Sequence, residues 1–587
     1  MQITKTIRFG SLAGLAALGS LGGCDRPQRP NIIFFLIDDN GWTDSQVAYG
    51  EEAYPFNGRY DTPNMLRLAE KGVIMTSGYA CPLSTPTRTA LMTGMNAAHE
   101  RITTYGALVR DTPTDAAGGT TGIINDNPDD PFGRSDWNWN GIQPEGVAIP
   151  GGKPVDHALT VTPLVRLLRD AGYHTIHVGK AHWAPAGTPG ASPYNMGFTV
   201  NVAGSNAGYP RSYLSEENYG NTKELWQGNA VMNLTEYYGT GTHLSEALTL
   251  EAKKALAEPI SRHQPFYLYM SHYGTHTPIQ PDMRYYRKYR DRGMDDGQAK
   301  YASMCEGMDK SLGDLMDFLE EKGVADNTVI ILYADNGGHS IDARKGGVPH
   351  TQNAPLREGK GSVYEGGIRE PLLVYVPGKT VGGMRINTPV GPEDFFPTIL
   401  EMAGIQGYKT IQPVDGESFY RLVTEGSRYV ARAVADGRIA SQKEANRFQV
   451  PASVSGLDPL RPIVSHMPHQ WRIEDQPEID WMSAVRSGPW KLVYRMHNVL
   501  QIPALPGDCD ALQAAISAGV FELYNLDEDI SEQHDLAASM PGKVADLVRL
   551  LGGRLRAWDA NMPVIRATGA PVPFPDELLG GLAEFVD

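Results

Sequence analysis

The chain has 587 residues, of which 41% are hydrophobic and 20% charged, and its formal net charge is −16. This composition excludes wholesale disorder, and the acidic balance argues against a nonspecific nucleic-acid binder. Four cysteines are too few for a disulfide scaffold at this length, although one disulfide among Cys81, Cys305 and Cys509 stays open.

The first residues have the layout of a signal peptide. Lys5 and Arg8 precede an apolar run from residue 12 to 21, which is too short for a good transmembrane helix. The following Gly-Gly-Cys24 resembles a bacterial lipobox, which implies cleavage after residue 23 and lipidation of Cys24. Plain secretion with cleavage nearby is the alternative. We therefore expect an exported lipoprotein of the periplasm or cell surface that contacts the membrane only through its lipid anchor.

Beyond a tether at residues 24–30, the hydrophobic pattern alternates between strands and helices. Residues 31–37 read as a strand buried on both faces, and strands near 174–178, 266–270 and 328–333 follow helices near 163–171, 244–257 and 298–322. A further helix is expected over 62–72. This alternation predicts an α/β fold in which helices sandwich a large mixed, mostly parallel sheet.

Two regions depart from this pattern. Residues 106–155 form a long polar stretch, and such loops are often functional. After about residue 456 the predicted elements no longer alternate in the same way. They are a hairpin over 483–495, a short strand at 521–526 and a helix at 543–558. We therefore expect a catalytic domain at 31–455 and a smaller C-terminal α+β domain at 456–587.

The most informative stretch is Cys81-Pro-Leu-Ser84-Thr-Pro86-Thr-Arg88-Thr-Ala-Leu-Met-Thr-Gly94. Pro86 favours a helix start, and Arg88 lies about one turn beyond Ser84. A helix N-terminus beside a guanidinium suits a tetrahedral anion held against Ser84. Taken alone, however, the pattern favours an ordinary N-cap role for Ser84.

This stretch resembles the signature of the type I sulfatases, which are formylglycine-dependent members of the alkaline phosphatase superfamily. That signature reads Cys or Ser, any residue, Pro, any residue, Arg, with Thr-Gly further on, and its first residue is oxidised to formylglycine. Only Ser84 has Pro and Arg at the required spacing, whereas Cys81 does not. The resemblance therefore implies an alkaline phosphatase-like fold and a serine-type bacterial sulfatase, matured by a radical SAM enzyme. Met95 departs from the signature, which often has Arg there.

Carboxylates follow two of the predicted strands. Asp38 and Asp39 end the first, and Asp335 and Asn336 follow a later one. Ligand sites in open parallel sheets lie at the carboxyl ends of the strands, and hard oxygen ligands suit calcium. Either group alone would favour a turn. Together with the resemblance they imply one Ca²⁺ ion, with the residue made from Ser84 as a further ligand.

Three more stretches match the family in order. Gly179-Lys180-Ala181-His182 follows a strand, Ser271-His-Tyr-Gly-Thr-His276-Thr-Pro carries a histidine, and residues 355–371 contain Lys360 within the second family signature. The resemblance implies that a hydrated formylglycine attacks sulfur while Arg88, Lys180 and Lys360 stabilise the sulfuryl oxygens. His276, alone or with Lys360, would protonate the leaving oxygen, and His182 would accept a proton from the second hydroxyl.

The expected substrate is a sulfated carbohydrate. Residues 94–99 resemble a subgroup that acts on galactose-type sugars, and Trp137 and Trp139 either stack on a sugar or anchor the polar loop. His272 either lines the pocket or caps a strand. Two other functions stay open: a phosphatase or phosphonate hydrolase of the same superfamily, or a non-catalytic glycan-binding protein if Ser84 is not oxidised. The residues expected to shape the pocket are His99, Arg101, Trp137, Trp139, Trp183, His272, His339 and Arg344.

Overall fold

The structure is a computed structural model that describes residues 29–106, 131–133, 135–225, 228–339, 353–470, 481–502 and 511–579. The expected signal peptide with its lipobox-like Cys24, and Arg344, which was expected to shape the pocket, lie outside these ranges. Within the described ranges, none of the helices combines the length and the apolar character needed to cross a membrane.

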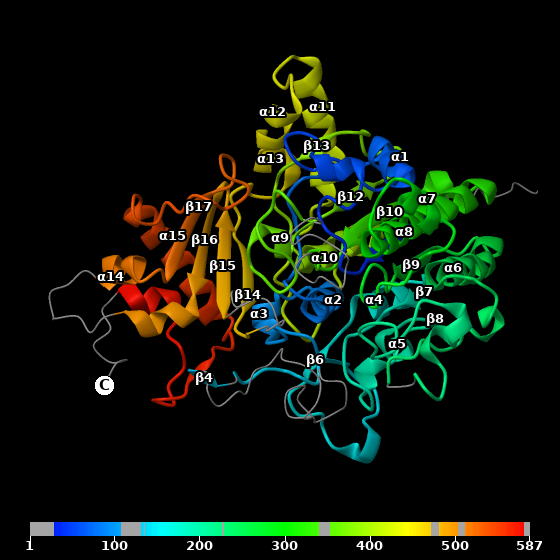
Figure 1. Ribbon diagram of the computed structural model, residues 1–587, viewed down its shortest axis with the longest axis horizontal. Helices are drawn as coiled ribbons and strands as arrows, with labels where there is room; N and C mark the ends of the chain where they lie inside the picture. The colour runs from blue at the N-terminus through cyan, green and yellow to red at the C-terminus, as the bar shows by residue number, and fades with distance from the viewer. Residues whose placement is uncertain are drawn as a thin grey trace, which may run out of the picture.

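The largest element is an eight-stranded mixed sheet (Figure 1). Its central strands run parallel to one another, and β12 is antiparallel to both of its neighbours. The sheet therefore confirms the predicted α/β fold with a large, mostly parallel sheet. From edge to edge its strands are β13 (Arg385–Ile386), β2 (Val73–Met75), β12 (Leu372–Tyr375), β10 (Thr328–Ala334), β1 (Asn31–Ile37), β9 (Phe266–Ser271), β7 (His174–Gly179) and β8 (Val200–Val202).

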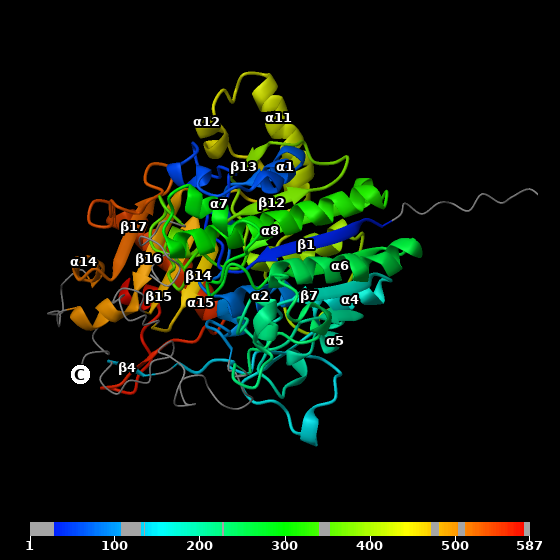
Figure 2. The same ribbon diagram turned by 45° about the vertical axis from the view of Figure 1, so that its right-hand side comes forward.

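Helices cover both faces of this sheet because alternate residues of its strands point to opposite sides. In β1, Phe34 belongs to one hydrophobic core and Phe35 to the other. The Phe34 core is closed by α2 (Ser84–Thr93), α4 (Leu164–Asp170), α10 (Phe395–Met402) and α11 (Ser427–Ala435). The Phe35 core is closed by α1 (Pro63–Lys71), α6 (Leu244–Ser261) and α8 (Asp296–Glu321), and α6 and α8 flank β1 in Figure 2.

A second, four-stranded antiparallel sheet stands beside the first and is drawn in orange in Figure 1. One of its faces packs on α15 (Pro541–Ala557), and the other contacts Leu83, Val363 and Tyr364. Its strands are β14 (Ile463–Met467), β15 (Met482–Ser487), β16 (Trp490–Arg495) and β17 (Phe521–Asn525), so the predicted hairpin is β15–β16.

Short elements complete the described chain. Part of the long polar stretch pairs with other regions, since β4 (Phe132–Gly133) joins β18 (Val564–Ile565) and β5 (Ile142–Pro144) joins β6 (Leu159–Val161). The strand β3 (Gly78–Tyr79) joins β11 (Arg369–Glu370). The remaining helices are α3 (Ala97–Glu100), α5 (Pro193–Met196), α7 (Tyr286–Asp291), α9 (Glu365–Ile368), α12 (Gln442–Arg447), α13 (Ala452–Ser455) and α14 (Ala511–Ser517).

Candidate functional site

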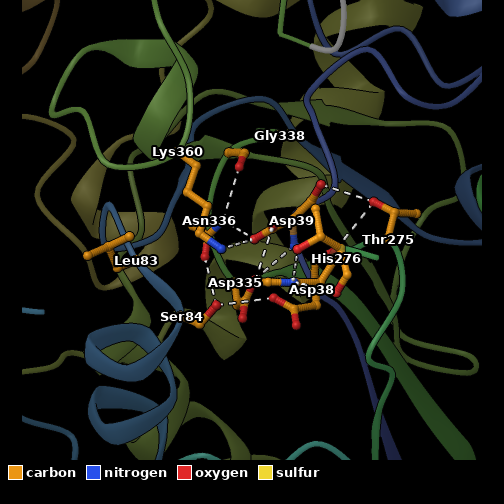
Figure 3. Close-up of polar contacts among 12 residues, drawn as sticks. Asp38, Asp39, Leu83, Ser84, Thr275, His276, Asp335, Asn336, Gly338 and Lys360 are labelled. Carbon is orange, nitrogen blue, oxygen red and sulfur yellow. Dashed lines mark hydrogen bonds and ion pairs between the residues drawn. The ribbon is translucent and has the colours of Figure 1, made fainter. Parts of the chain in front are cut away.

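Four adjacent strands of the large sheet end at one place. Asp38 and Asp39 follow β1, Asp335 and Asn336 follow β10, and Lys180 follows β7. The loop after β9 leads to His276. Because these strands are parallel, their carboxyl ends bring side chains from four distant parts of the chain together. Figure 3 shows this for Asp38, Asp39, His276, Asp335 and Asn336.

Three carboxylates converge in this site. Asp38, Asp39 and Asp335 are fully buried, and each offers an oxygen within 4.8 Å of the others. Burial, followed by the charge of Asp38, raises the pKa of Asp335. Such mutual repulsion favours a bound cation, and three carboxylates are hard ligands of the kind that calcium takes. The donor set therefore fits the Ca²⁺ ion that the sequence suggests.

Ser84 is the first residue of α2 and faces these carboxylates. Its hydroxyl donates to Asp38 Oδ1 at 3.1 Å or to Asn336 Oδ1 at 3.0 Å. The N-cap position belongs instead to Leu83, which has an extended backbone. The simplest expectation from the sequence, an N-cap serine, is thus wrong. The Ser84 side chain points away from its own helix and toward the acidic cluster (Figure 3).

Three cationic side chains surround the same cluster. Arg88 pairs with Asp335 through Nη2 at 2.7 Å, Lys180 with Asp38 Oδ2 at 2.7 Å, and Lys360 with Asp39 Oδ1 at 2.6 Å. Burial lowers the pKa of Lys180 to about 8, which Asp38 partly opposes. Burial would lower the pKa of Lys360 too, but Asp39 and Asp38 outweigh it and raise that pKa. These cations therefore balance much of the acidic charge and surround the Ser84 hydroxyl region with positive charge.

The two predicted histidines lie at different depths. His276 is half-buried, with Nε2 3.7 Å from Asp39 Oδ2. His182 is buried, and its Nδ1 lies 3.2 Å from the Thr85 hydroxyl beside Ser84. Burial, followed by the charges of Lys180 and Arg88, holds the pKa of His182 well below its usual range. His182 is therefore a neutral imidazole at neutral pH.

Sequence reasoning missed the side chains that hold the loop of His276. The hydroxyl of Tyr213 donates to the carbonyl of Tyr273 at 2.6 Å or to that of His276 at 2.9 Å. The ring of Tyr209 stacks on His276 with centroids 5.7 Å apart. Neither tyrosine belongs to a recognisable motif. Their position in a polar, glycine-containing stretch between β8 and α6 gave no signal that they lie near the site.

Comparison with known proteins identifies the family of this chain. The model of the Sulfatase family matches residues 30–405, which is more than half of the chain. The chain belongs to the sulfatase family. It is therefore a sulfuric ester hydrolase.

Individual relatives are distant but extensive. A sulfatase of Formosa agariphila is 26% identical, with 95% of this chain and 93% of that protein aligned. The N-acetylgalactosamine-6-sulfatase of Homo sapiens is 28% identical over 66% of this chain and 64% of its own length. Among solved structures, Ps i-CgsB in complex with k-i-k-neocarrahexaose has a TM-score of 0.59, with 24% identity over 90% of this chain and 93% of that chain. That structure supports the sulfatase fold.

Several residues expected to shape the pocket of this sulfatase belong to the core instead. Trp183 is fully buried and stacks on Phe198. His272 is buried and its Nε2 lies 2.9 Å from the Ser311 hydroxyl, so its ring packs against α8. Trp137 is 1% exposed, so it anchors the polar loop. The sequence placed these rings near the motifs, but neighbours in a chain often point to opposite sides of a sheet.

The other expected pocket residues differ in burial and contact various partners. Trp139 stacks on His157, with centroids 3.4 Å apart. His99 is partly exposed and its Nδ1 lies 2.9 Å from Asp415, while Arg101 contacts Asp136. His339 is buried, shortly after Asp335 and Asn336 in the chain. Cys81, the neighbour of the signature, is a buried free thiol, as is Cys305.

Proposed function

We propose that this sulfatase removes sulfate esters from a carbohydrate, with one Ca²⁺ ion and a formylglycine made from Ser84. The observation that carries the proposal is the position of the Ser84 hydroxyl, within 3.1 Å of both Asp38 and Asn336. The Ser84 hydroxyl therefore lies beside an acidic cluster whose carboxylates pair with Arg88, Lys180 and Lys360, which supports its role as the residue to be oxidised. A surface or N-cap serine would have no such surroundings.

Five residues would hold the ion: Asp38, Asp39, Asp335 and Asn336, with the side chain at position 84 as the further ligand. All of them are buried, so water competes little for the ion. When bound, Ca²⁺ supplies positive charge next to the oxygens of residue 84 and of the substrate sulfate.

The chain's own cations would bind and orient the sulfate group. Lys180 pairs with Asp38, Lys360 with Asp39, and Arg88 of α2 with Asp335. Charge that develops on the sulfuryl oxygens in the transition state is stabilised best by such fixed, water-excluded cations. As formylglycine, residue 84 would supply the hydrated aldehyde whose oxygen reacts with sulfur.

The two imidazoles suit opposite proton transfers. His276 is the more exposed and lies on the Asp39 side, where a departing sugar oxygen would reach solvent, so we assign it the role of proton donor to that oxygen. His182 is neutral and hydrogen-bonded to Thr85, so we assign it the role of proton acceptor from residue 84.

The substrate class rests on the relatives. The human relative is named for N-acetylgalactosamine 6-sulfate, a galactose-type sugar, which agrees with the resemblance of residues 94–99. We therefore propose a galactose-type sulfated polysaccharide or its oligosaccharides as the substrate. We also propose that a radical SAM enzyme oxidises Ser84 and that a lipid on Cys24 anchors the exported protein.

Two measurements test this proposal. Mass spectrometry of the peptide that contains Ser84 should find the loss of two hydrogens after co-expression with a maturing enzyme. The matured protein should then release sulfate from sulfated galactose-type oligosaccharides far faster than phosphate from matched phosphate esters. An unmodified Ser84 in active protein, or a preference for phosphate, would overturn the proposal.

A further inference from the structure

The segment that carries Lys360 is held from two sides. Toward the site, Gly361 N donates to the Pro82 carbonyl at 2.8 Å, and Gly337 N donates to the Gly367 carbonyl at 3.1 Å. Residues 353–369 therefore lie between the loop before Ser84 and the strand end that carries Asp335 and Asn336. A shift of this segment would move Lys360 relative to Asp39.

On its other side the segment meets buried charges of the four-stranded sheet. Glu365 Oε1 accepts from Lys491 Nζ of β16 at 2.9 Å, and Lys491 Nζ lies 2.8 Å from Glu532 Oε1. Glu532 Oε2 in turn accepts from the Glu365 backbone N–H at 2.7 Å. The result is a closed ring of three buried side chains that fixes both the side chain and the backbone of residue 365.

Neighbouring groups extend this contact. Glu365 Oε2 accepts from the hydroxyl of Tyr79 at 2.8 Å and from Arg369 at 3.1 Å, and Arg486 of β15 donates to the Tyr79 hydroxyl at 2.5 Å. We call Glu365, Lys491, Glu532, Arg369 and Arg486 the interface cluster. Each of its acids faces at least one cation, as buried charges require.

Apolar contacts bind the same two parts of the chain. Leu83, which directly precedes Ser84, and Val363, three residues after Lys360, share one buried hydrophobic cluster with Ala484 and Val493 of the four-stranded sheet. That sheet therefore touches both segments that supply the proposed nucleophile and the proposed sulfate-binding lysine. In the described part of the chain it contributes none of the residues that surround Ser84.

We propose that Lys491 is a positioning residue of the sulfatase reaction, acting through Glu365 to hold Lys360 against Asp39. The proposal rests on the function proposed for Lys360. Without Lys491, Glu365 and Glu532 would be two buried carboxylates without their shared cation, and their repulsion would loosen the 353–369 segment. Small displacements of a catalytic group lower rates strongly.

The test compares Lys491→Met with Arg461→Met. Arg461 forms a buried ion pair with Asp394 Oδ2 at 2.5 Å, just before β14, and it contacts neither the Ser84 segment nor the Lys360 segment in any hydrogen bond or ion pair of the described chain. We expect Lys491→Met to lower kcat by about ten- to a hundredfold with a smaller change in KM, and Lys491→Arg to restore most of it. Arg461→Met should lose stability but keep kcat.

A double-mutant cycle separates positioning from general destabilisation. If Lys491 acts through Lys360, then Lys491→Met should have little further effect on kcat in the Lys360→Ala background. Effects that multiply in the double variant would overturn the proposal. If Lys491→Met folds poorly, Glu532→Gln, which keeps an acceptor for the Glu365 N–H, gives the same comparison in milder form.

Hydrogen exchange provides a readout that does not depend on activity. Amides of residues 353–369 should exchange faster in Lys491→Met than in both the wild type and Arg461→Met. Unchanged exchange there would overturn the positioning role even if turnover fell. A wild type that releases no sulfate would instead overturn the proposed function, and the exchange experiment would still decide whether Lys491 holds the segment.

Discussion

Two buried charge clusters lie on either side of the 353–369 segment, and they solve the problem of buried charge differently. In the interface cluster, a single cation, Lys491, lies between Glu365 and Glu532 and pairs with both. In the site, Asp38, Asp39 and Asp335 each pair with a separate cation, and their oxygens still approach within 4.8 Å of one another. The first arrangement is self-contained, whereas the second keeps acidic oxygens directed at a common point where a ligand would bind.

The largest effect should come from substitution of Ser84, whose hydroxyl contacts the acidic cluster. Ser84→Ala removes the oxygen that formylglycine would carry, so we expect sulfate release to fall by at least about 10⁴-fold. Steady-state assays of the matured wild type and variant measure this loss. Cys81→Ala is the matched control, since Cys81 is a buried thiol three residues away, and it should keep turnover within a few-fold. A Ser84→Ala protein with substantial turnover would refute the role of this residue.

The second largest difference between the two clusters should be their effect on stabilisation by calcium. An ion that binds only the folded protein stabilises it by about 2.7 kcal/mol at a hundredfold excess over Kd, so calcium added after chelation should raise Tm by a few degrees. Asp38→Asn should strongly weaken this response because it removes a negative charge from the residues that would hold the ion.

The contrasting variant lies in the interface cluster. Glu365→Gln should lower Tm with and without calcium, since Lys491 loses a buried partner, yet the rise in Tm on adding calcium should persist. Differential scanning fluorimetry measures Tm of Asp38→Asn and of Glu365→Gln, each with and without calcium. A calcium response that Asp38→Asn leaves intact would place the ion elsewhere.

His276 should show its role through the leaving group. If His276 protonates the departing oxygen, His276→Ala should lower kcat by about 10²–10⁴-fold for a sugar sulfate and far less for a nitrophenyl sulfate, whose phenolate leaves without a proton. His272→Asn is the control, because His272 contacts Ser311 in the core, and it should affect both substrates alike. Equal losses on both substrates in His276→Ala would contradict the acid role.

The fold was readable from the sequence because its signals are local. The apolar run at 31–37 and the helices near 163–171 and 244–257 follow periodic patterns, and the structure places β1, α4 and α6 there. The convergence of Asp38 with Asp335 was also predictable, since residues after parallel strands meet at one sheet edge.

Long-range partners were not readable in the same way. The Lys360–Asp39 pair spans 321 residues, and the bond between Lys491 and Glu365 spans 126. The sequence pattern does not single out Lys491. The alternation of residues along a strand does not show which face of the hairpin carries its side chain. Trp183 was misplaced for a related reason, because nearness to His182 in the chain does not fix which way a ring points.

Glu100 is a buried acid outside both charge clusters, and its hydrogen-bond partners are hydroxyl groups, not cations. Glu100 of α3 accepts hydrogen bonds from the hydroxyls of Thr89, at 2.6 Å, and Thr93, both on the helix that begins at Ser84. Burial raises the pKa of Glu100 to about 8, and the two hydroxyls only partly oppose this. Its ionised form is therefore poorly supported compared with the acids of either charge cluster.

The last effect we predict follows from this raised pKa. Below about pH 4.3, the ordinary value for glutamate, both folded and unfolded states hold the proton. Between that pH and about 8, only the folded state keeps it, so the contribution of Glu100 to stability falls as pH rises and is lowest above 8. From pH 5.5 to 8 the loss is roughly 2–4 kcal/mol, and Glu100→Gln should remove it. Urea unfolding at both pH values measures the difference, with Glu401→Gln on the exposed side of α10 as control. The unfolding free energy of Glu100→Gln could instead decline with pH as much as that of the wild type. In that case Glu100 is already ionised in the folded protein, and groups other than Thr89 and Thr93 must stabilise its charge.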